Sequence, residues 1–284
     1  MRVSCIVLTR GDRPVELVRC LDSVRGQAGV ELETVLVGNG CTVDAGAADV
    51  VLSLPENLGV AEGRNRGAAA ASGDVLWFLD DDARVEAPDL AAATAAAFGD
   101  PAVAVVAMRV VDERGRTQRE HLPRIGTASA DRPGAVTSFL GGACAIRRTA
   151  FERLGGLPGP FFYALEETDF AWRAIDAGWS VVYRPELRVV HPHAESRLKH
   201  PSFHTSTARN RVWLAHRNLP GPLAAVYVLD WLLITVARSW RRPADIRAAV
   251  AGTRVGVRAP LGPRRPMAWR TVWRLARLGR PPLL

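Results

Sequence analysis

Short, mostly apolar runs of residues are the feature of this sequence that most constrains its fold. Each run has the length of a strand, and an apolar run without strict alternation is typical of a strand buried on both faces. The runs are Val3–Leu8, Thr34–Val37, Val50–Leu54, Val75–Leu79 and Val103–Met108. Segments with helical spacing lie between several of them, at Pro14–Val24, Ala61–Ala71 and Pro88–Phe98. Strands that alternate with helices predict an α/β domain with a mostly parallel sheet and flanking helices.

The second half of the chain is less regular. We expect a loop or irregular hairpin over 112–138, followed by a compact Gly-Gly segment over Phe139–Arg147. A helix is expected over Thr168–Ala177, with Thr168 as candidate N-cap and Gly178 after its end. Short strands are expected at Ser180–Tyr183 and Arg188–Val190. From Leu219 onward an apolar helix and arginine-rich helices follow, broken by proline and glycine. We therefore expect an α/β domain at residues 1–217 and a helical appendage at 218–284.

Charge is distributed unevenly along the 284 residues. The net charge is +8, and twelve arginines against the single acid Asp245 follow residue 237, so the preceding part is slightly acidic. A basic tail of this kind binds an anionic membrane, nucleic acid or another acidic partner, or remains a solvated arm. The apolar stretch Leu223–Ala237 contains Asp230 and is marginal for a helix that spans a membrane.

The cysteines and the first residues bear on the cellular compartment. Cys5 and Cys144 lie in apolar runs and are expected to be buried, and no cysteine pair has the spacing of a zinc site or a disulfide framework. The apolar segment after Arg2 is too short for a signal peptide and is typical of a strand. These features predict a cytoplasmic protein.

Three consecutive aspartates, Asp80-Asp81-Asp82, follow the predicted strand Val75–Leu79 directly. Ligands of parallel α/β sheets lie beyond the carboxyl ends of the strands, and Thr9-Arg10-Gly11-Asp12 follows the first strand in the same way. Adjacent carboxylates repel one another, and a bound Mg²⁺ or Mn²⁺ would compensate and would bridge to phosphate. The alternative is a solvated acidic entry to the helix near Pro88. The position at a strand end favours the metal.

Two further groups carry side chains suited to chemistry. Glu166, Glu167 and Asp169 follow an aromatic run, and burial beside aromatic rings raises a carboxyl pKa toward that of a general base. The alternative is an acidic first turn that suits the helix dipole. His191-Pro192-His193 places two imidazoles on one side of an extended segment, either as metal ligands or as hydrogen-bonding surface residues.

The segment 57–67 is rich in glycine, contains Arg64 and leads into a helix, so its backbone and its arginine could approach a phosphate. It lacks the Gly-Lys-Ser/Thr of a Walker loop and the spacing of a dinucleotide loop.

Taken together and in their order along the chain, these motifs resemble those of the family 2 glycosyltransferases, which have the GT-A fold. The run NLGVAEGRNRGAAAASGDVLWFLDDDA is similar to one signature of that family, and FFYALEETDFAWRAIDAGWSVVYRPELRVVHPHAES is similar to a second. The resemblance covers residues 1–217 and is greatest to the rhamnosyl- and galactofuranosyl-type enzymes of cell-envelope polysaccharide assembly. It implies an inverting, metal-dependent transfer of a sugar from a nucleotide-sugar donor to an acceptor hydroxyl.

The resemblance also implies roles for individual residues. Metal ligands would be Asp82, Asp80 and His191, for Mn²⁺ or Mg²⁺. Nucleotide-sugar binding would involve Thr9, Arg10, Asp12, Asn39, Arg64, Asp80 and Asp81. Glu167 would be the general base, with Glu166 and Asp169 as the other candidate catalytic acids. Gly141 and Gly142 would border the acceptor, and Arg209-Asn210-Arg211 matches a basic run that follows the catalytic region.

Two departures from the family pattern are visible. The second strand often ends Val-Asp-Asn in the family, with the aspartate touching the base, whereas this chain has Val37-Gly38-Asn39. The base is therefore open among UDP, dTDP and GDP. Glu167 also stands where many relatives have aspartate.

Partners follow from these features. The acceptor hydroxyl would be lipid-linked, part of a glycan or on a small molecule. The tail, with Trp231, Trp240, Trp269 and Trp273, suits a peripheral position on the inner face of the membrane or a homodimer contact. Two alternatives remain, a sugar-nucleotide nucleotidyltransferase and a non-catalytic protein that binds nucleic acid through the arginine-rich tail. Nucleic-acid binding gives no reason for the acidic triplet.

Overall fold

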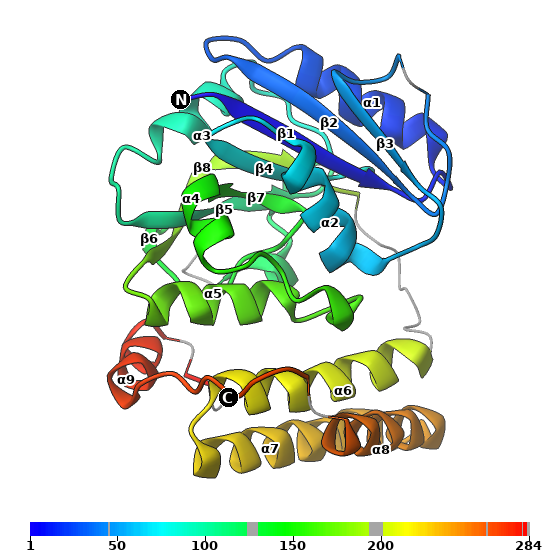
Figure 1. Ribbon diagram of the computed structural model, residues 1–284, viewed down its shortest axis with the longest axis vertical. Helices are drawn as coiled ribbons and strands as arrows, with labels where there is room; N and C mark the ends of the chain where they lie inside the picture. Colours follow the sequence, from blue (N-terminus) through cyan, green and yellow to red (C-terminus); the bar gives the residue numbers. More distant parts are fainter. Residues whose placement is uncertain (45, 124–129, 193–200, 260, 280, 283–284) are drawn as a thin grey trace.

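In the computed structural model, the described residues form a central sheet of eight strands (Figure 1). The structure describes all residues except 45, 124–129, 193–200, 260, 280 and 283–284. The strands are β1 (Val3–Thr9), β2 (Leu32–Asn39), β3 (Val50–Leu54), β4 (Val75–Asp80), β5 (Val103–Val111), β6 (Gly134–Ala135), β7 (Ala143–Arg147) and β8 (Ser180–Val190). Their order across the sheet is β3-β2-β1-β4-β7-β5-β8-β6.

The strands predicted from the apolar runs form the parallel part of this sheet. β1 pairs in parallel with β2 and β4, β2 pairs in parallel with β3, and β5 pairs in parallel with β8. Strand β7 lies between β4 and β5 and is antiparallel to both. The carboxyl ends of β1, β2 and β4 consequently lie at one edge, where Thr9, Asn39 and Asp80 are the last strand residues.

Helices cover both faces of the sheet, as the unbroken apolar runs predict. Helices α1 (Pro14–Arg25) and α3 (Leu90–Ala96) lie on one face, and α2 (Gly59–Ala70), α4 (Arg148–Arg153) and α5 (Glu166–Asp176) lie on the other (Figure 1). Alternate residues of one strand belong to two different cores: Ile6 packs with the α2 and α5 side, whereas Cys5 and Val7 pack with the α1 and α3 side. The sheet is thus buried on both faces.

The last strand is followed by helices α6 (Pro201–Asn218), α7 (Gly221–Ser239), α8 (Pro243–Arg258) and α9 (Trp269–Arg277). Helix α6 lies between α5 and the α7–α8 pair (Figure 1). Its buried Trp213 and Leu214 join the same core as Phe170 of α5. The domain boundary after residue 217 stays a prediction.

The less regular second half differs in detail from the sequence-based expectation. The Gly-Gly segment ends in strand β7, which was not predicted because its pairing partners, β4 and β5, lie far away in sequence. The two short strands after Gly178 are one strand, β8, with an irregularity where its pairing with β5 passes from Arg184 to Arg188. Thr168 is not the N-cap: α5 begins at Glu166, and Leu165, with φ 72°, holds the cap position. Cys5 and Cys144 are buried, as predicted.

Candidate active site

A cavity of about 710 Å³ opens at the edge where β1, β2 and β4 end. Its walls come from these strand ends, the start of α2, the segment before α5 and the first turns of α6. The sequence-predicted residues that line it are Thr9, Arg10, Asp12, Asn39, Arg64, Asp80, Asp81, Asp82, Gly142, Glu166, Glu167 and His191. Residues separated by more than 100 positions in the chain therefore meet in one place.

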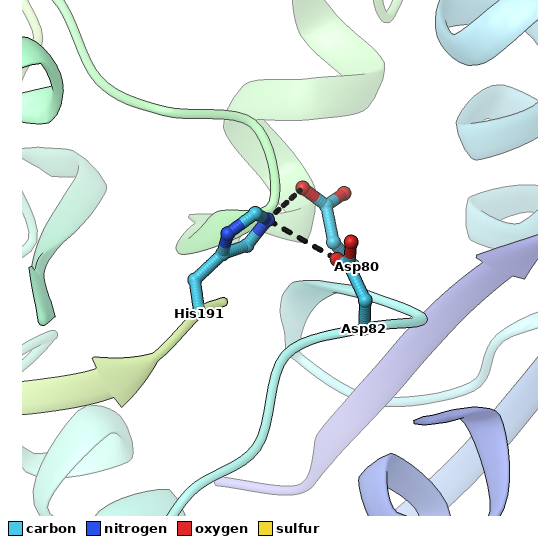
Figure 2. A group of neighbouring side chains, drawn as sticks. All are labelled: Asp80, Asp82 and His191. Carbon is cyan, nitrogen blue, oxygen red and sulfur yellow. Dashed lines mark ion pairs between the residues drawn. The ribbon is translucent and has the colours of Figure 1, made fainter. Parts of the chain in front are cut away.

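Asp80, Asp82 and His191 converge on one point (Figure 2). The His191 Nε2 lies 3.1 Å from an oxygen of Asp82 and 3.7 Å from an oxygen of Asp80. One ligand atom from each of the three lies within 4.8 Å of the others. His191 follows β8 directly, and its own N–H donates to the Val111 carbonyl at 2.9 Å, so β5 fixes its position. His193 lies outside the described residues.

The two carboxylates make this point favourable for positive charge. Burial opposes ionisation of Asp80, but the hydrogen bond from His191 and the charge of Arg64 hold the pKa of Asp80 well below its usual range. Burial likewise disfavours a charged imidazole, yet the two carboxylates raise the pKa of His191 to about 10. Two carboxylates and an imidazole are also a donor set that suits a divalent metal. The three residues fit such an ion.

Asp81 has a different environment from its two neighbours. Its carboxylate accepts a hydrogen bond from the Thr9 hydroxyl at 2.7 Å, and burial, together with the adjacent Asp82 charge, raises the pKa of Asp81 to about 6. The sequence analysis missed Arg13, whose guanidinium pairs with Asp82 and lies 3.6 Å from Asp81. Arg13 precedes α1, and its sequence position gives no sign that its side chain reaches β4.

Arg64 connects the acidic triplet to the two glutamates. Its buried guanidinium lies 2.8 Å from Asp80, 3.8 Å from Glu166 and 3.9 Å from Glu167. Gly141 and Gly142 make this approach feasible. A Cβ at Gly141 would overlap the Arg64 guanidinium, and a Cβ at Gly142 would overlap the Asp80 carboxylate. The glycine pair is therefore required for packing, and its predicted acceptor role stays a prediction.

Glu166 and Glu167 open α5 and share a buried environment. Burial raises the pKa of Glu167, and burial together with the Glu167 charge raises the pKa of Glu166 to about 8. Glu167 is the more accessible of the two, with 18% of its side chain exposed against 2% for Glu166. The Gly141 N–H donates to Glu167 at 3.2 Å. Glu167 is thus oriented, reachable and disposed to take up a proton.

Asp169 does not belong to this site. It is fully buried outside the cavity lining, and its carboxylate accepts hydrogen bonds from Arg173, Arg217 and Asn218 at 2.7–3.0 Å. The charges of Arg173 and Arg217, with the hydrogen bonds from Arg217 and Asn218, hold the pKa of Asp169 below its usual range despite burial. Its position contradicts a catalytic role: Asp169 ties α5 to α6.

The loop formed by residues 161–165 leads into the glutamates and is strained. Phe162, Ala164 and Leu165 have positive φ angles of 64°, 73° and 72°, a region that non-glycine residues seldom adopt. Asn210 of α6 is fully buried, and its side-chain amide lies 2.8–2.9 Å from the carbonyls of Phe161, Tyr163 and Ala164. The resemblance had singled out Asn210 only as part of a basic run.

The end of the cavity at β1 and β2 differs from the family pattern. A Cβ at Gly38 would overlap the Cys41 carbonyl, so backbone fills the place of the missing aspartate side chain. Asn39 is buried, and its amide donates to Asn57 at 3.0 Å and to the Gly59 carbonyl at 3.1 Å. Arg10 and Asp12 are exposed at the mouth, 3.6 Å apart.

Comparison with known proteins agrees with this geometry. The model of the family described as glycosyl transferase family 2 matches residues 4–155. The chain belongs to this family. A pre-mycofactocin glycosyltransferase of Mycobacterium tuberculosis is 28% identical over 256 residues, covering 82% of this chain and 53% of that protein. An N-acetylglucosaminyl-diphospho-decaprenol L-rhamnosyltransferase of the same organism is 32% identical over 77 residues, covering 27% of this chain and 25% of that protein. The chain thus spans about half the length of the first relative and a quarter of the second.

Solved structures identify the fold. A mannosyltransferase from Pyrobaculum calidifontis, in complex with GDP-Man and Mn²⁺, superposes with a TM-score of 0.60 at 20% identity, covering 97% of this chain and 79% of that one. GalNAc-T7 with UDP, GalNAc and Mn²⁺ gives 0.64 at 16% identity, with coverages of 92% and 55%. The chain has the GT-A fold, as the resemblance implied, with additional C-terminal helices. Membership of glycosyl transferase family 2 favours glycosyl transfer over the nucleotidyltransferase and nucleic-acid-binding alternatives.

Proposed function

We propose that this protein transfers a glycosyl group from a nucleoside-diphosphate sugar to an acceptor hydroxyl, with inversion at the anomeric carbon. One observation carries the proposal: a single cavity joins a cluster of two carboxylates and an imidazole, a buried arginine and an accessible glutamate with a raised pKa. A departing diphosphate needs the first two, and an attacking hydroxyl needs the third.

Asp80, Asp82 and His191 would hold a divalent cation. When bound, the ion supplies positive charge that stabilises the charge developing on the diphosphate. The carboxylates suit Mg²⁺ and Mn²⁺, and the imidazole favours Mn²⁺. The Mn²⁺ in the two structural neighbours supports this choice for a related fold.

The protein's own side chains perform the remaining steps. Thr9, Arg10, Asp12 and Asn39 would surround the nucleotide at the β1 and β2 end. Arg64 would stabilise charge on the departing diphosphate from inside the protein, where a low dielectric strengthens the interaction.

Glu167 would accept the proton of the acceptor hydroxyl as that oxygen attacks the anomeric carbon. The new C–O bond forms on the face opposite to the breaking bond, whose electron pair leaves with the diphosphate. One such displacement inverts the configuration. The products are the glycoside, a nucleoside diphosphate and a protonated Glu167.

The acceptor is proposed to be a lipid-linked hydroxyl at the inner face of the membrane. One relative is named for N-acetylglucosaminyl-diphospho-decaprenol, a lipid-linked sugar, and this supports a lipid-linked acceptor. The apolar and basic C-terminal region supports a peripheral location at the membrane. Glycan and small-molecule acceptors are the alternatives.

Turnover with UDP-, dTDP- and GDP-sugars in the presence of Mn²⁺ tests the proposal. We expect nucleoside diphosphate as product, an inverted anomeric signal by NMR, and loss of both on chelation. The variant Glu167→Gln should retain donor binding by calorimetry but lose transfer, whereas Glu152→Gln, on the exposed surface of α4, should behave as the unmodified protein. Retained configuration, or near-normal transfer by Glu167→Gln, would contradict the assignment.

A further inference from the structure

The outward face of α7 is apolar and exposed to solvent over most of the helix. Val226, Leu229, Leu233, Val236 and Trp240 are 39–65% exposed. Their spacing of three and four residues places them along one side of the helix, and we call this set the α7 stripe. An exposed apolar surface of this extent marks an interaction site.

The opposite face of α7 is fixed to the protein. Leu223 and Tyr227 are buried, and the Tyr227 ring packs edge-on against Trp172 of α5, with centroids 6.0 Å apart. Among the described residues, α7 is the one helix long and apolar enough to cross a membrane by length and composition, with a mean hydropathy of 1.4, yet only 17% of its apolar window is buried. Contact along one side favours a helix that lies on a surface over one that crosses a bilayer.

Positive charge borders the stripe. Arg238, Arg241 and Arg242 are exposed at its C-terminal end, and the Arg241 guanidinium lies 4.5 Å from the centre of the Trp240 ring. The acidic residues of α7 and α8 are Asp230 and Asp245. Asp245 is buried, with an oxygen 3.6 Å from His204, so it offsets little of the surface charge.

We propose that the α7 stripe and the arginines beside it bind an anionic lipid bilayer, with α7 lying in the interfacial plane. A bilayer offers apolar chains to the stripe and negative headgroups to the arginines, and tryptophan is enriched at this depth. Two copies packed stripe to stripe would bring two arginine-rich surfaces together. Nucleic acid would pair with the arginines but leave the stripe exposed. The surface extends the proposed function, because a lipid-linked acceptor would be met at the same membrane.

Co-sedimentation of the full chain with lipid vesicles, without donor or metal, tests this surface. We compare phosphatidylcholine vesicles with vesicles in which about 30% of the lipid is anionic phosphatidylglycerol. The difference between them measures the attraction of the arginines to negative headgroups. Arg241→Gln/Arg242→Gln should lower the partition coefficient for the anionic vesicles about 25-fold, since each arginine near such a surface contributes about five-fold. Leu229→Gln/Leu233→Gln should lower it about ten-fold or more.

The matched control is Val15→Gln/Val18→Gln on α1. These two residues are as exposed as the leucines, at 57% and 56%, but lie outside α7. The control should leave vesicle binding unchanged, and all three variants should keep the melting temperature because every altered side chain is exposed.

Three results would overturn the inference. One is equal binding to both vesicle types. Another is full binding by the leucine variant. The third is a dimer in light scattering, or binding to DNA, in a protein that does not sediment with anionic vesicles. Transfer to a soluble acceptor is measured separately, so binding without transfer would refute the proposed function alone, and transfer without binding would refute this surface alone.

Discussion

Removing the Asn210 side chain should slow catalysis without weakening donor binding. Asn210 has two amide hydrogens for three nearby carbonyls, and the segment that it holds contains three residues with positive φ. In Asn210→Ala the part-buried carbonyls of Tyr163 and Ala164 lose this donor, which costs up to about 1–3 kcal/mol each if the loop stays in place. The Phe161 carbonyl, by contrast, keeps Arg209 as a donor. The three residues with positive φ cost about 1–2 kcal/mol each in the parent protein as well as in the variant. Relaxation of the loop then becomes favourable.

Relaxation would displace Glu167, because the loop runs directly into the first turn of α5. A shift of about 1 Å at a reacting group lowers the rate roughly 100-fold. Steady-state kinetics should therefore show kcat reduced about 100-fold and the KM for the donor unchanged, with thermal unfolding reporting a loss of about 2–3 kcal/mol.

Asn218→Ala is the matched control for this change. Asn218 is also a buried asparagine on α6, and its amide donates to Asp169 at 2.8 Å and to the Leu214 carbonyl at 3.1 Å. It should lose similar stability and keep its kcat. Displacement of Glu167 predicts a loss far larger than about three-fold in kcat. If Asn210→Ala lost stability like the control but kept its kcat within that limit, the positioning role would be refuted.

Three further predictions concern the site and its support. Because the pKa of Glu167 is raised and the carboxylate is the active form, kcat/KM should fall as pH decreases through a value above that of ordinary glutamate, and a pH profile with its midpoint near 4 would contradict this. Gly142→Ala places a methyl group against the Asp80 carboxylate, so Mn²⁺ affinity measured by calorimetry should fall at least about ten-fold, and unchanged affinity would argue against Asp80 as a ligand. Asp169→Asn should cost about 3–5 kcal/mol in denaturant unfolding at neutral pH. Since the folded-state pKa of Asp169 is lowered, its stabilisation is complete above the unfolded value and is lost as pH falls through the folded value, so the variant and the parent should converge in acid.

Local sequence patterns predicted the parallel part of the fold and the residues at its edge. The run Val75–Leu79 and the aspartates after it form a strand end in the structure, because burial on both faces and the strand-end rule need no distant information. The His-Pro-His pattern singled out His191, the family resemblance implied that it is a metal ligand, and the structure places it 3.1 Å from Asp82.

Features that depend on distant contacts were not predicted. Arg13 meets Asp82 only after α1 has packed on the sheet, and β7 is defined by partners on both sides. The N-terminus of α5 was misplaced because Leu165 adopts a positive φ, in a loop whose Ala164 carbonyl accepts a hydrogen bond from Asn210 of the distant helix α6. Asp169 looked catalytic beside the glutamates in sequence, but the helix turns it toward Arg173 and Arg217.

Strand β7 divides the sheet into an early and a late part of the chain. The aspartates belong to the part that is synthesised first, whereas the glutamates and His191 come from segments that follow β7. A ribosome-bound chain that has reached residue 155, the end of the family match, carries Asp80, Asp82 and Arg64 without any of these later partners. Asp80, Asp82 and His191 thus come together only when β8 has paired with β5, so metal affinity at these residues would report on that pairing.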